Sequence, residues 1–225
     1  HYAGVSTGTS SRRVYNTQYA AHILGRVSRI FAEDWNDKYK NNSDYSMDDL
    51  VGKGGVEEAF EQYLHGVNGV KLVTTDKSGK VTGELYAKEP QPGNTVALTI
   101  DLDLQKTAED SLAATIQSMT KSDGVARGGA AAVVGVGTGE VLALASYPTY
   151  DLSQWDEMYD TWNKDTVGRP MFNRATDGTY APGSTFKLCS AVAALESGIV
   201  TPSTPIVDRA IYTSYTFPQP KCWIS

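Results

Sequence analysis

The chain has 225 residues, of which 40% are hydrophobic and 20% charged, a balance typical of globular proteins that argues against disorder. Its formal net charge of −6 argues against a nucleic-acid-binding surface, because such surfaces are basic. No apolar run approaches the ~18 residues that span a bilayer. The chain opens at His1 rather than Met, so we expect a trimmed N-terminus, and the lack of an anchor here says little about the native protein.

Residues 1–94 are expected to form one unit of helices and strands. Apolar side chains recur at helical spacing between Ala20 and Val27. A second amphipathic stretch follows Glu58, runs through Phe60, Tyr63 and Leu64, and is expected to stop at Gly66. The acidic residues here are expected to form a solvated helix face: Glu57, Glu58 and Glu61.

A β-hairpin is predicted next. Residues 70–74 and 80–85 have the composition of strands, and the Asp-Lys-Ser-Gly sequence at 76–79 is typical of a turn. Residues 90–94 contain two prolines and a glycine, which break both the helical and the strand periods. This segment is therefore the best candidate for a linker between two domains.

A strand and a long helix are predicted after the linker. The strand is expected over residues 95–100, and Asp101 is a good N-cap for the helix that follows. Apolar side chains at helical spacing support that helix: Leu104, Ala108, Leu112 and Ile116.

Two further apolar runs predict a second, buried hairpin. Residues 130–136 and 140–146 surround the glycine-rich turn at 137–139, and Pro148 is expected to end the pair. Residues 151–177 are polar and aromatic without a clean period, so we expect loop with short helices.

A serine and a lysine three residues apart follow in the stretch Tyr180-Ala181-Pro182-Gly183-Ser184-Thr185-Phe186-Lys187. The Pro-Gly before Ser184 and the apolar run after it predict a buried helix that ends at Gly198. At this spacing, Ser184 and Lys187 lie on one face of the helix, one turn apart. Cys189 is expected to be a small core residue of the same helix.

This pair can act as an activated nucleophile. Lys187 can take the Ser184 proton if it is held neutral, and the helix N-terminal dipole and burial both disfavour its charged form. The backbone N–H of Ser184, unsatisfied at a helix start, would suit an oxyanion. From spacing alone, an alternative stays open in which Ser184 only caps the helix and Lys187 extends to solvent.

Other chemical motifs find little support. The second Ser-x-x-Lys match, Ser118 to Lys121, lies in a polar helix tail and is interpreted as chance. The three histidines, His1, His22 and His65, all lie in the first unit, and His22 is expected to be structural. Neither a Ser-His-Asp triad nor a metal-binding pattern is present, and no cofactor is expected. The glycines near the serine lack the lysine of a phosphate-binding loop.

Ordered stretches along nearly the whole chain carry a family resemblance. They are Arg13-Val14-Tyr15, Ala20-Ala21-His22-Ile23-Leu24-Gly25, Gly52-Lys53-Gly54-Gly55-Val56-Glu57, Leu64-His65-Gly66-Val67-Asn68-Gly69, Leu98-Thr99-Ile100-Asp101-Leu102-Asp103-Leu104-Gln105, the stretch 138–151, Asn173-Arg174-Ala175 and the stretch 180–187. Together they resemble a class B penicillin-binding protein, a monofunctional peptidoglycan D,D-transpeptidase, and Ser-x-x-Lys is a signature of such enzymes. The resemblance implies an α+β fold. Residues 1–94 would form a pedestal, or dimerisation-type, domain, and residues 95–225 the first part of a penicillin-binding transpeptidase domain.

The resemblance also implies a reaction. Ser184 would attack D-Ala-D-Ala stem peptides of peptidoglycan, Lys187 would take its proton, and β-lactams would acylate Ser184. It implies a location on the outer face of the bacterial cell membrane, through an anchor absent from this chain. Other cell-wall synthesis proteins would dock on residues 1–94, and no nucleic acid, metal or cofactor is implied.

Two motifs that the family carries after its nucleophile, S-x-N and K-[ST]-G, do not occur after Ser184 in this chain. Lys77-Ser78-Gly79 has the letters of the second motif but precedes the serine. The sequence is therefore interpreted as a family member truncated within the transpeptidase domain. The resemblance implies that the strand carrying K-[ST]-G supplies one donor to the oxyanion. A polypeptide of these residues alone is therefore expected to be inactive or nearly so.

Two alternatives stay open. One is a β-lactam sensor or β-lactamase-like protein that uses the same Ser-Lys pair, which steady turnover of a β-lactam would reveal. The other is a non-catalytic interaction module in which residues 1–94 dock a cell-wall partner. The sequence does not separate roles in elongation, division or sporulation.

Overall fold

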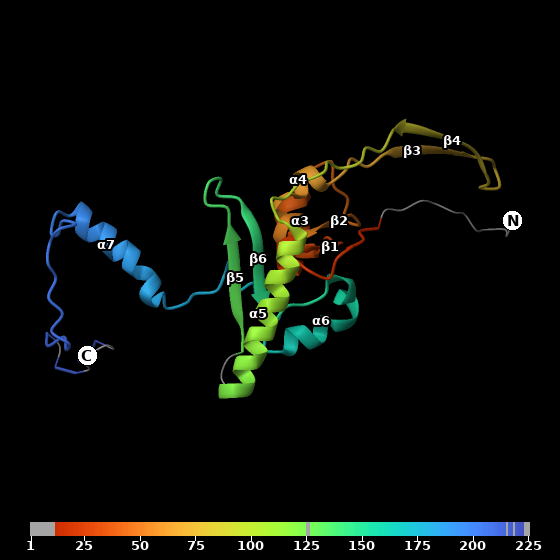
Figure 1. Cartoon of the computed structure of the whole chain (residues 1–225). Helices are drawn as coiled ribbons and strands as arrows, with labels where there is room; N and C mark the ends of the chain where they lie inside the picture. Colours follow the sequence, from red (N-terminus) through yellow and green to blue (C-terminus); the bar gives the residue numbers. More distant parts are fainter. Residues whose placement is uncertain (1–11, 125–126, 215, 218, 223–225) are drawn as a thin grey trace. The chain divides into compact units, whose positions relative to one another are not determined.

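The computed structural model describes residues 12–124, 127–214, 216–217 and 219–222. The chain divides into two compact units, His1–Gly178 and Thr179–Ser225 (Figure 1). Within the described residues, the first unit contains three two-stranded antiparallel sheets with helices, and the second contains a short 3₁₀ turn and one helix. The elements of the first unit are α1 (Ala21–Leu24), β1 (Arg26–Arg29), α2 (Ala32–Asp34), the π-helix η1 (Trp35–Tyr39), β2 (Leu50–Lys53), α3 (Gly55–Ala59), α4 (Glu61–Leu64), β3 (Val70–Thr75), β4 (Val81–Lys88), α5 (Leu102–Asp123), β5 (Gly129–Val134), β6 (Val141–Tyr147), the 3₁₀ turn η2 (Leu152–Gln154) and α6 (Trp155–Lys164). Those of the second are η3 (Gly183–Phe186) and α7 (Lys187–Glu196).

The predicted helix over Ala20 to Val27 is wrong in its second half. Helix α1 ends at Leu24, and Val27 lies in β1, which pairs with β2. Gly25 causes the change, because its φ of 74° is a left-handed conformation that side chains rarely adopt. A Cβ at Gly25 would also lie 1.9 Å from the Gly54 carbonyl oxygen, so only glycine allows this close approach of the two segments.

The predicted solvated face of acidic residues is also wrong for two of its three members. Glu57 is buried and forms an ion pair with Arg13, with 2.9 Å between the guanidinium nitrogen and the carboxylate. The Glu61 carboxylate accepts a 2.7 Å hydrogen bond from the backbone N–H of Gly52. Glu58 is exposed, as expected. Helical spacing gave no sign of these partners, because they lie on other elements.

The first predicted hairpin is confirmed. Strands β3 and β4 pair antiparallel, and the Asp76 carboxylate closes their turn by accepting hydrogen bonds from the backbone N–H groups of Ser78 and Lys80. All residues of β3 are exposed, and the hairpin forms the long two-stranded arm in Figure 1. Lys77-Ser78-Gly79 lies in this turn.

The segment between the arm and α5 departs from the prediction. Residues 90–94 are irregular, and the last N–H of this segment donates to the Tyr63 carbonyl oxygen at 2.7 Å. The strand predicted over 95–100 is absent. Instead, the Thr99 hydroxyl and the Asp101 N–H donate to consecutive carbonyl groups of β6, at 2.7 and 2.9 Å. One of these donors is a side chain, so the segment follows β6 without forming a backbone ladder.

The predicted long helix and the pairing of the second hairpin are confirmed, but the predicted burial holds only for part of β6, because the residues of β5 are exposed or half-buried. Asp101 caps α5 by accepting a 3.0 Å hydrogen bond from the Leu104 N–H. Strands β5 and β6 pair antiparallel, and α5 packs on β6. Ala143 and Ala145 of β6 are fully buried. Among the described residues, no helix combines the length and apolarity needed to cross a bilayer.

A buried glutamine fixes α5 to β6. Gln105 is 0% exposed, and its amide both accepts from the Leu144 N–H, at 2.7 Å, and donates to the Leu144 carbonyl oxygen, at 2.9 Å. The same amide donates to Glu109 at 2.7 Å, and Glu109 accepts from the Ala20 N–H at 2.7 Å. Since burial of unpaired polar groups is costly, this chain of hydrogen bonds sets how α1, α5 and β6 pack.

His22 is structural, as predicted. Its Nε2 lies 2.8 Å from the Pro170 carbonyl oxygen, and its ring packs edge-on against Tyr150, with 5.0 Å between centroids. Burial lowers the pKa of His22, while the hydrogen bond to Pro170 opposes that shift. Tyr150 also contacts Trp155 and Trp162 of α6, so an aromatic cluster connects α1 with the predominantly loop region 151–177.

Candidate functional site

Ser184 and Lys187 are brought together by one tight turn. Ser184 lies in η3, which begins at Gly183 with its positive φ of 54°, and Lys187 is the first residue of α7. The backbone N–H of Lys187 donates to the Ser184 carbonyl oxygen, which is the i to i+3 bond of a 3₁₀ turn. Side chains three residues apart eclipse one another in such a turn. The two side chains therefore leave the same side of the backbone.

The predicted burial of this helix is not observed. Leu188 is 76% exposed and Val192 59% exposed. Cys189, predicted as a core residue, is exposed with a free thiol, and the Lys187 side chain is exposed as well. An apolar sequence indicates that a helix has a face to bury, but it does not supply the covering surface. The predicted burial of Lys187 is therefore not seen among the described residues.

The predicted end of the helix is confirmed. Helix α7 stops at Glu196, and Gly198 has a φ of 70°, the left-handed conformation common just after helices. The N–H of Gly198 donates to the Leu195 carbonyl oxygen at 3.1 Å. Helix α7 thus ends where Gly198 predicts its C-terminus.

The second Ser-x-x-Lys match lies elsewhere. Ser118 and Lys121 are exposed residues near the end of α5, in the other compact unit. No tight turn or left-handed glycine introduces Ser118, because it lies in the interior of a regular helix. Ser118 is therefore a natural internal control for Ser184.

We call residues 165–177 the strap. From this segment, the sequence pointed only to Asn173-Arg174-Ala175, as part of the family resemblance. The Arg174 guanidinium donates to the carbonyl oxygens of Gly168 and Arg169. The backbone N–H of Arg174 donates to the Ser146 hydroxyl at 3.0 Å, which ties the strap to β6. The sequence could have indicated this role of Arg174, because carbonyl groups in a segment without regular secondary structure need hydrogen-bond donors and an arginine supplies several.

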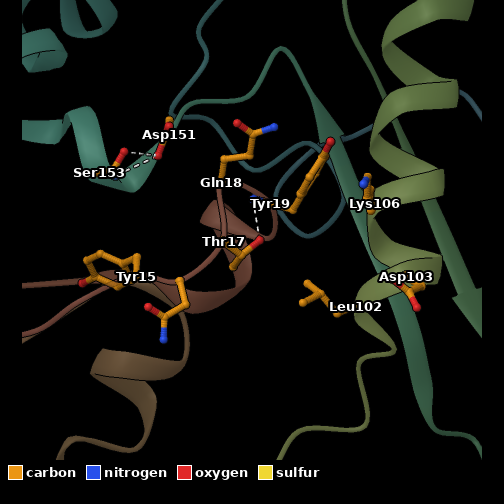
Figure 2. A pocket seen from close by; sticks show the side chains of 10 residues that line it. Tyr15, Thr17, Gln18, Tyr19, Leu102, Asp103, Lys106, Asp151 and Ser153 are labelled. Carbon is orange, nitrogen blue, oxygen red and sulfur yellow. Dashed lines mark hydrogen bonds between the residues drawn. The ribbon is translucent and has the colours of Figure 1, made fainter.

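An open polar hollow of about 510 Å³ lies in the first unit, between the segment before α1 and the start of α5 (Figure 2). Lys106 lies 5.8 Å from the ring centroid of Tyr19, whose hydroxyl is 3.3 Å from both Asp110 carboxylate oxygens. The lining residues are Tyr15, Asn16, Thr17, Gln18, Tyr19, Leu102, Asp103, Lys106, Asp151 and Ser153. Across the described ranges, no three His, Cys, Asp or Glu side chains gather as a metal site requires.

Comparisons with known proteins decide the family. Residues 1–98 match the penicillin-binding protein dimerisation domain, and residues 129–218 match the penicillin-binding protein transpeptidase domain. The peptidoglycan D,D-transpeptidase MrdA of Acinetobacter baumannii is 34% identical over 220 residues, which is 94% of this chain and 30% of that protein. The chain belongs to the class B penicillin-binding proteins. The predicted fold class, a dimerisation-type domain followed by the start of a transpeptidase domain, is confirmed.

Solved structures of penicillin-binding proteins share this fold. A structure of a peptidoglycan synthase complex that coordinates polymerization and crosslinking has a TM-score of 0.76 and 32% identity, covering 93% of this chain and 37% of that one. A complex between PBP2 and MreC from Helicobacter pylori has a TM-score of 0.71 and 25% identity, covering 92% and 37%. This class B penicillin-binding protein chain spans about a third of the length of the curated relatives it matches.

Proposed function

We propose that these residues supply the pedestal and the nucleophile of a peptidoglycan D,D-transpeptidase, anchored to the bacterial cell membrane and active on its outer face. Ser184 is the nucleophile and Lys187 the general base. The observation that carries the proposal is the 3₁₀ turn closed by the bond from the Lys187 N–H to the Ser184 carbonyl oxygen, in a chain of this family. The substrates are stem peptides that end in D-Ala-D-Ala.

The proposed reaction has two acyl-transfer steps. Ser184 Oγ attacks the carbonyl carbon of the penultimate D-Ala, while neutral Lys187 accepts the hydroxyl proton. The C–N bond to the terminal D-Ala breaks, and that amine leaves with a proton. An amine of a neighbouring stem peptide then attacks the ester, forms the cross-link, and releases the serine oxygen, which regains a proton. Attack on a β-lactam opens its ring and leaves the acyl group on Ser184.

Hydrolysis of a D-Ala-D-Ala thioester analogue tests this proposal in the protein expressed from its complete gene. Ser184→Ala is expected to abolish the activity. Ser118→Ala, at the chance match, is expected to keep the wild-type rate. Full activity in Ser184→Ala would contradict the assignment, and steady β-lactam hydrolysis in the wild type would favour the β-lactamase-like alternative.

For the domains, we propose that residues 1–94 form the pedestal and residues 95–225 the first part of the transpeptidase domain. The pedestal is proposed to dock other cell-wall synthesis proteins. The related PBP2–MreC and synthase complexes support this docking. We expect the 225-residue chain to bind a purified MreC-like protein of the same bacterium. Absence of binding would contradict the proposed docking of this partner on the pedestal.

A further inference from the structure

The strap is an ordered segment although it has no regular secondary structure. Its carbonyl groups at Gly168 and Arg169 accept hydrogen bonds from the Arg174 guanidinium, and Asp165 accepts from the N–H groups of Val167 and Gly168. These bonds satisfy backbone groups that a helix or sheet would otherwise satisfy. The strap therefore has one defined shape.

Two residues at the β5–β6 hairpin contact the strap. The Ser146 hydroxyl of β6 accepts from the Arg174 N–H and donates to the Phe172 carbonyl oxygen, at 3.0 and 3.3 Å. Gly128, just before β5, lets the guanidinium approach, because a Cβ there would lie 2.5 Å from Arg174 Nε. The strap is thus fixed to the β5–β6 hairpin at its C-terminal end.

The pedestal half holds the strap at one further point, through His22. The His22 Nε2 donates to the Pro170 carbonyl oxygen at 2.8 Å, which leaves Nδ1 as the acceptor that faces the Thr149 hydroxyl at 3.5 Å. Helix α1, which carries His22, is itself tied to α5 by the 2.7 Å bond from the Ala20 N–H to Glu109. His22 therefore connects a fixed part of the pedestal to the middle of the strap.

The strap leads directly to the nucleophile along the chain. Its last residue, Asp177, precedes Ser184 by seven positions, and its N–H donates to the Asn173 carbonyl oxygen at 2.9 Å. The strap is thus the last ordered segment before the nucleophile segment along the chain. Misplacement of reacting groups by about 1 Å can lower a rate about 100-fold, even when the change lies far from the chemistry.

We propose that His22 is a positioning residue for acylation of Ser184, and that it acts by holding the Pro170 carbonyl group of the strap. The inference rests on the proposed function. A histidine that only fills space would leave the acylation rate unchanged when its donor is lost. A positioning His22 makes the acylation rate depend on a hydrogen-bond donor at the Nε2 position. The packing of the ring against Tyr150 does not supply that donor.

The test compares acylation rates with benzylpenicillin in the protein expressed from its complete gene. His22→Phe keeps an aromatic ring but loses the donor, and His22→Gln keeps an N–H at the position of Nε2. If His22→Phe does not fold, His22→Asn replaces it, because its amide is one methylene shorter. His65→Phe is the matched control: it removes another partly buried pedestal histidine, whose ring lies 3.2 Å from Glu61 and stacks on Tyr45, away from the strap.

We expect His22→Phe to slow acylation about tenfold or more, and His22→Gln to restore the rate to within about threefold of wild type. His65→Phe is expected to acylate at the wild-type rate per folded molecule, even where its melting temperature falls. Wild-type acylation by His22→Phe, or equal slowing in His22→Gln and His22→Phe, would overturn the inference alone. Absence of acylation at wild-type Ser184 would instead remove the proposed function, and this inference with it.

Discussion

Buried polar side chains hold the elements of the first unit together. Gln105 joins α5 to β6, and Glu109 joins α5 to the residue before α1. Glu57 anchors α3 to the segment before α1 through Arg13. Each of these groups is buried and each has a partner on another element, which is the condition under which a buried polar residue stabilises a fold. Their loss therefore leaves unpaired groups rather than a simple cavity.

Gln105→Leu is expected to destabilise the chain by about 3 kcal/mol, because the Leu144 N–H and carbonyl groups would lose their buried partner. Urea denaturation of the 225-residue chain measures the change. Thr115→Leu, at an exposed position of the same helix, is the control and is expected to change stability by less than about 0.5 kcal/mol. Equal effects of the two substitutions would show that Gln105 does not join these elements.

Burial raises the pKa of the Glu109 carboxyl above its ordinary value of 4.5, although hydrogen bonds from Gln105 and Ala20 oppose the shift. The folded chain therefore holds the proton to a higher pH than the unfolded chain does. Stability from this group is fully present below the unfolded pKa and falls as the pH rises through the folded pKa. Glu109→Gln is expected to flatten the pH dependence of the melting temperature in that window, whereas Glu157→Gln, at an exposed position, is expected to leave it unchanged.

At the scale of helices and strands, the predictions that held depend on local chemistry. Asp101 as a cap, the 76–79 turn and Gly198 after α7 can each be recognised within a few residues. The failures depend on distant partners. The segment 95–100 follows β6 through a threonine side chain, and α7 lacks the covering surface that its apolar residues suggest.

Asp101→Ala should destabilise α5 by about 1 kcal/mol, because the Leu104 N–H loses its capping acceptor. Thermal or urea unfolding of the 225-residue chain measures this. Asp103→Ala is the matched control, since Asp103 lies exposed in the first turn of the same helix without acting as the cap. A loss as large in Asp103→Ala would point to the helix dipole rather than to the cap.

At the scale of the whole molecule, the family could be recognised from the order of many short stretches, whereas Ser-x-x-Lys alone occurs twice in this chain. The structure gives several of these stretches a physical role, among them the Arg13–Glu57 pair and the Gln105 joint. The candidate site was predictable as a pair of residues in one turn. Its surroundings were not, because an apolar sequence predicts burial whereas Lys187 and the apolar residues of α7 are exposed.

A polypeptide of these 225 residues alone is expected to hydrolyse a D-Ala-D-Ala thioester at least about 100-fold more slowly than the protein expressed from its complete gene. The reason is that S-x-N and K-[ST]-G motifs are lacking after Ser184, and one missing oxyanion donor alone costs about 10²–10³ in rate. Side-by-side steady-state assays measure the ratio. Comparable rates, abolished in the short chain by Ser184→Ala, would refute this expectation.

The central claim is that Ser184 is the residue that becomes acylated. Its most direct test is the intact mass of the protein expressed from its complete gene, before and after benzylpenicillin, followed by peptide mapping of the adduct. The account predicts one stable adduct on the peptide that carries Ser184, present in Ser118→Ala and absent in Ser184→Ala. An adduct on any other residue, or its persistence in Ser184→Ala, would contradict it.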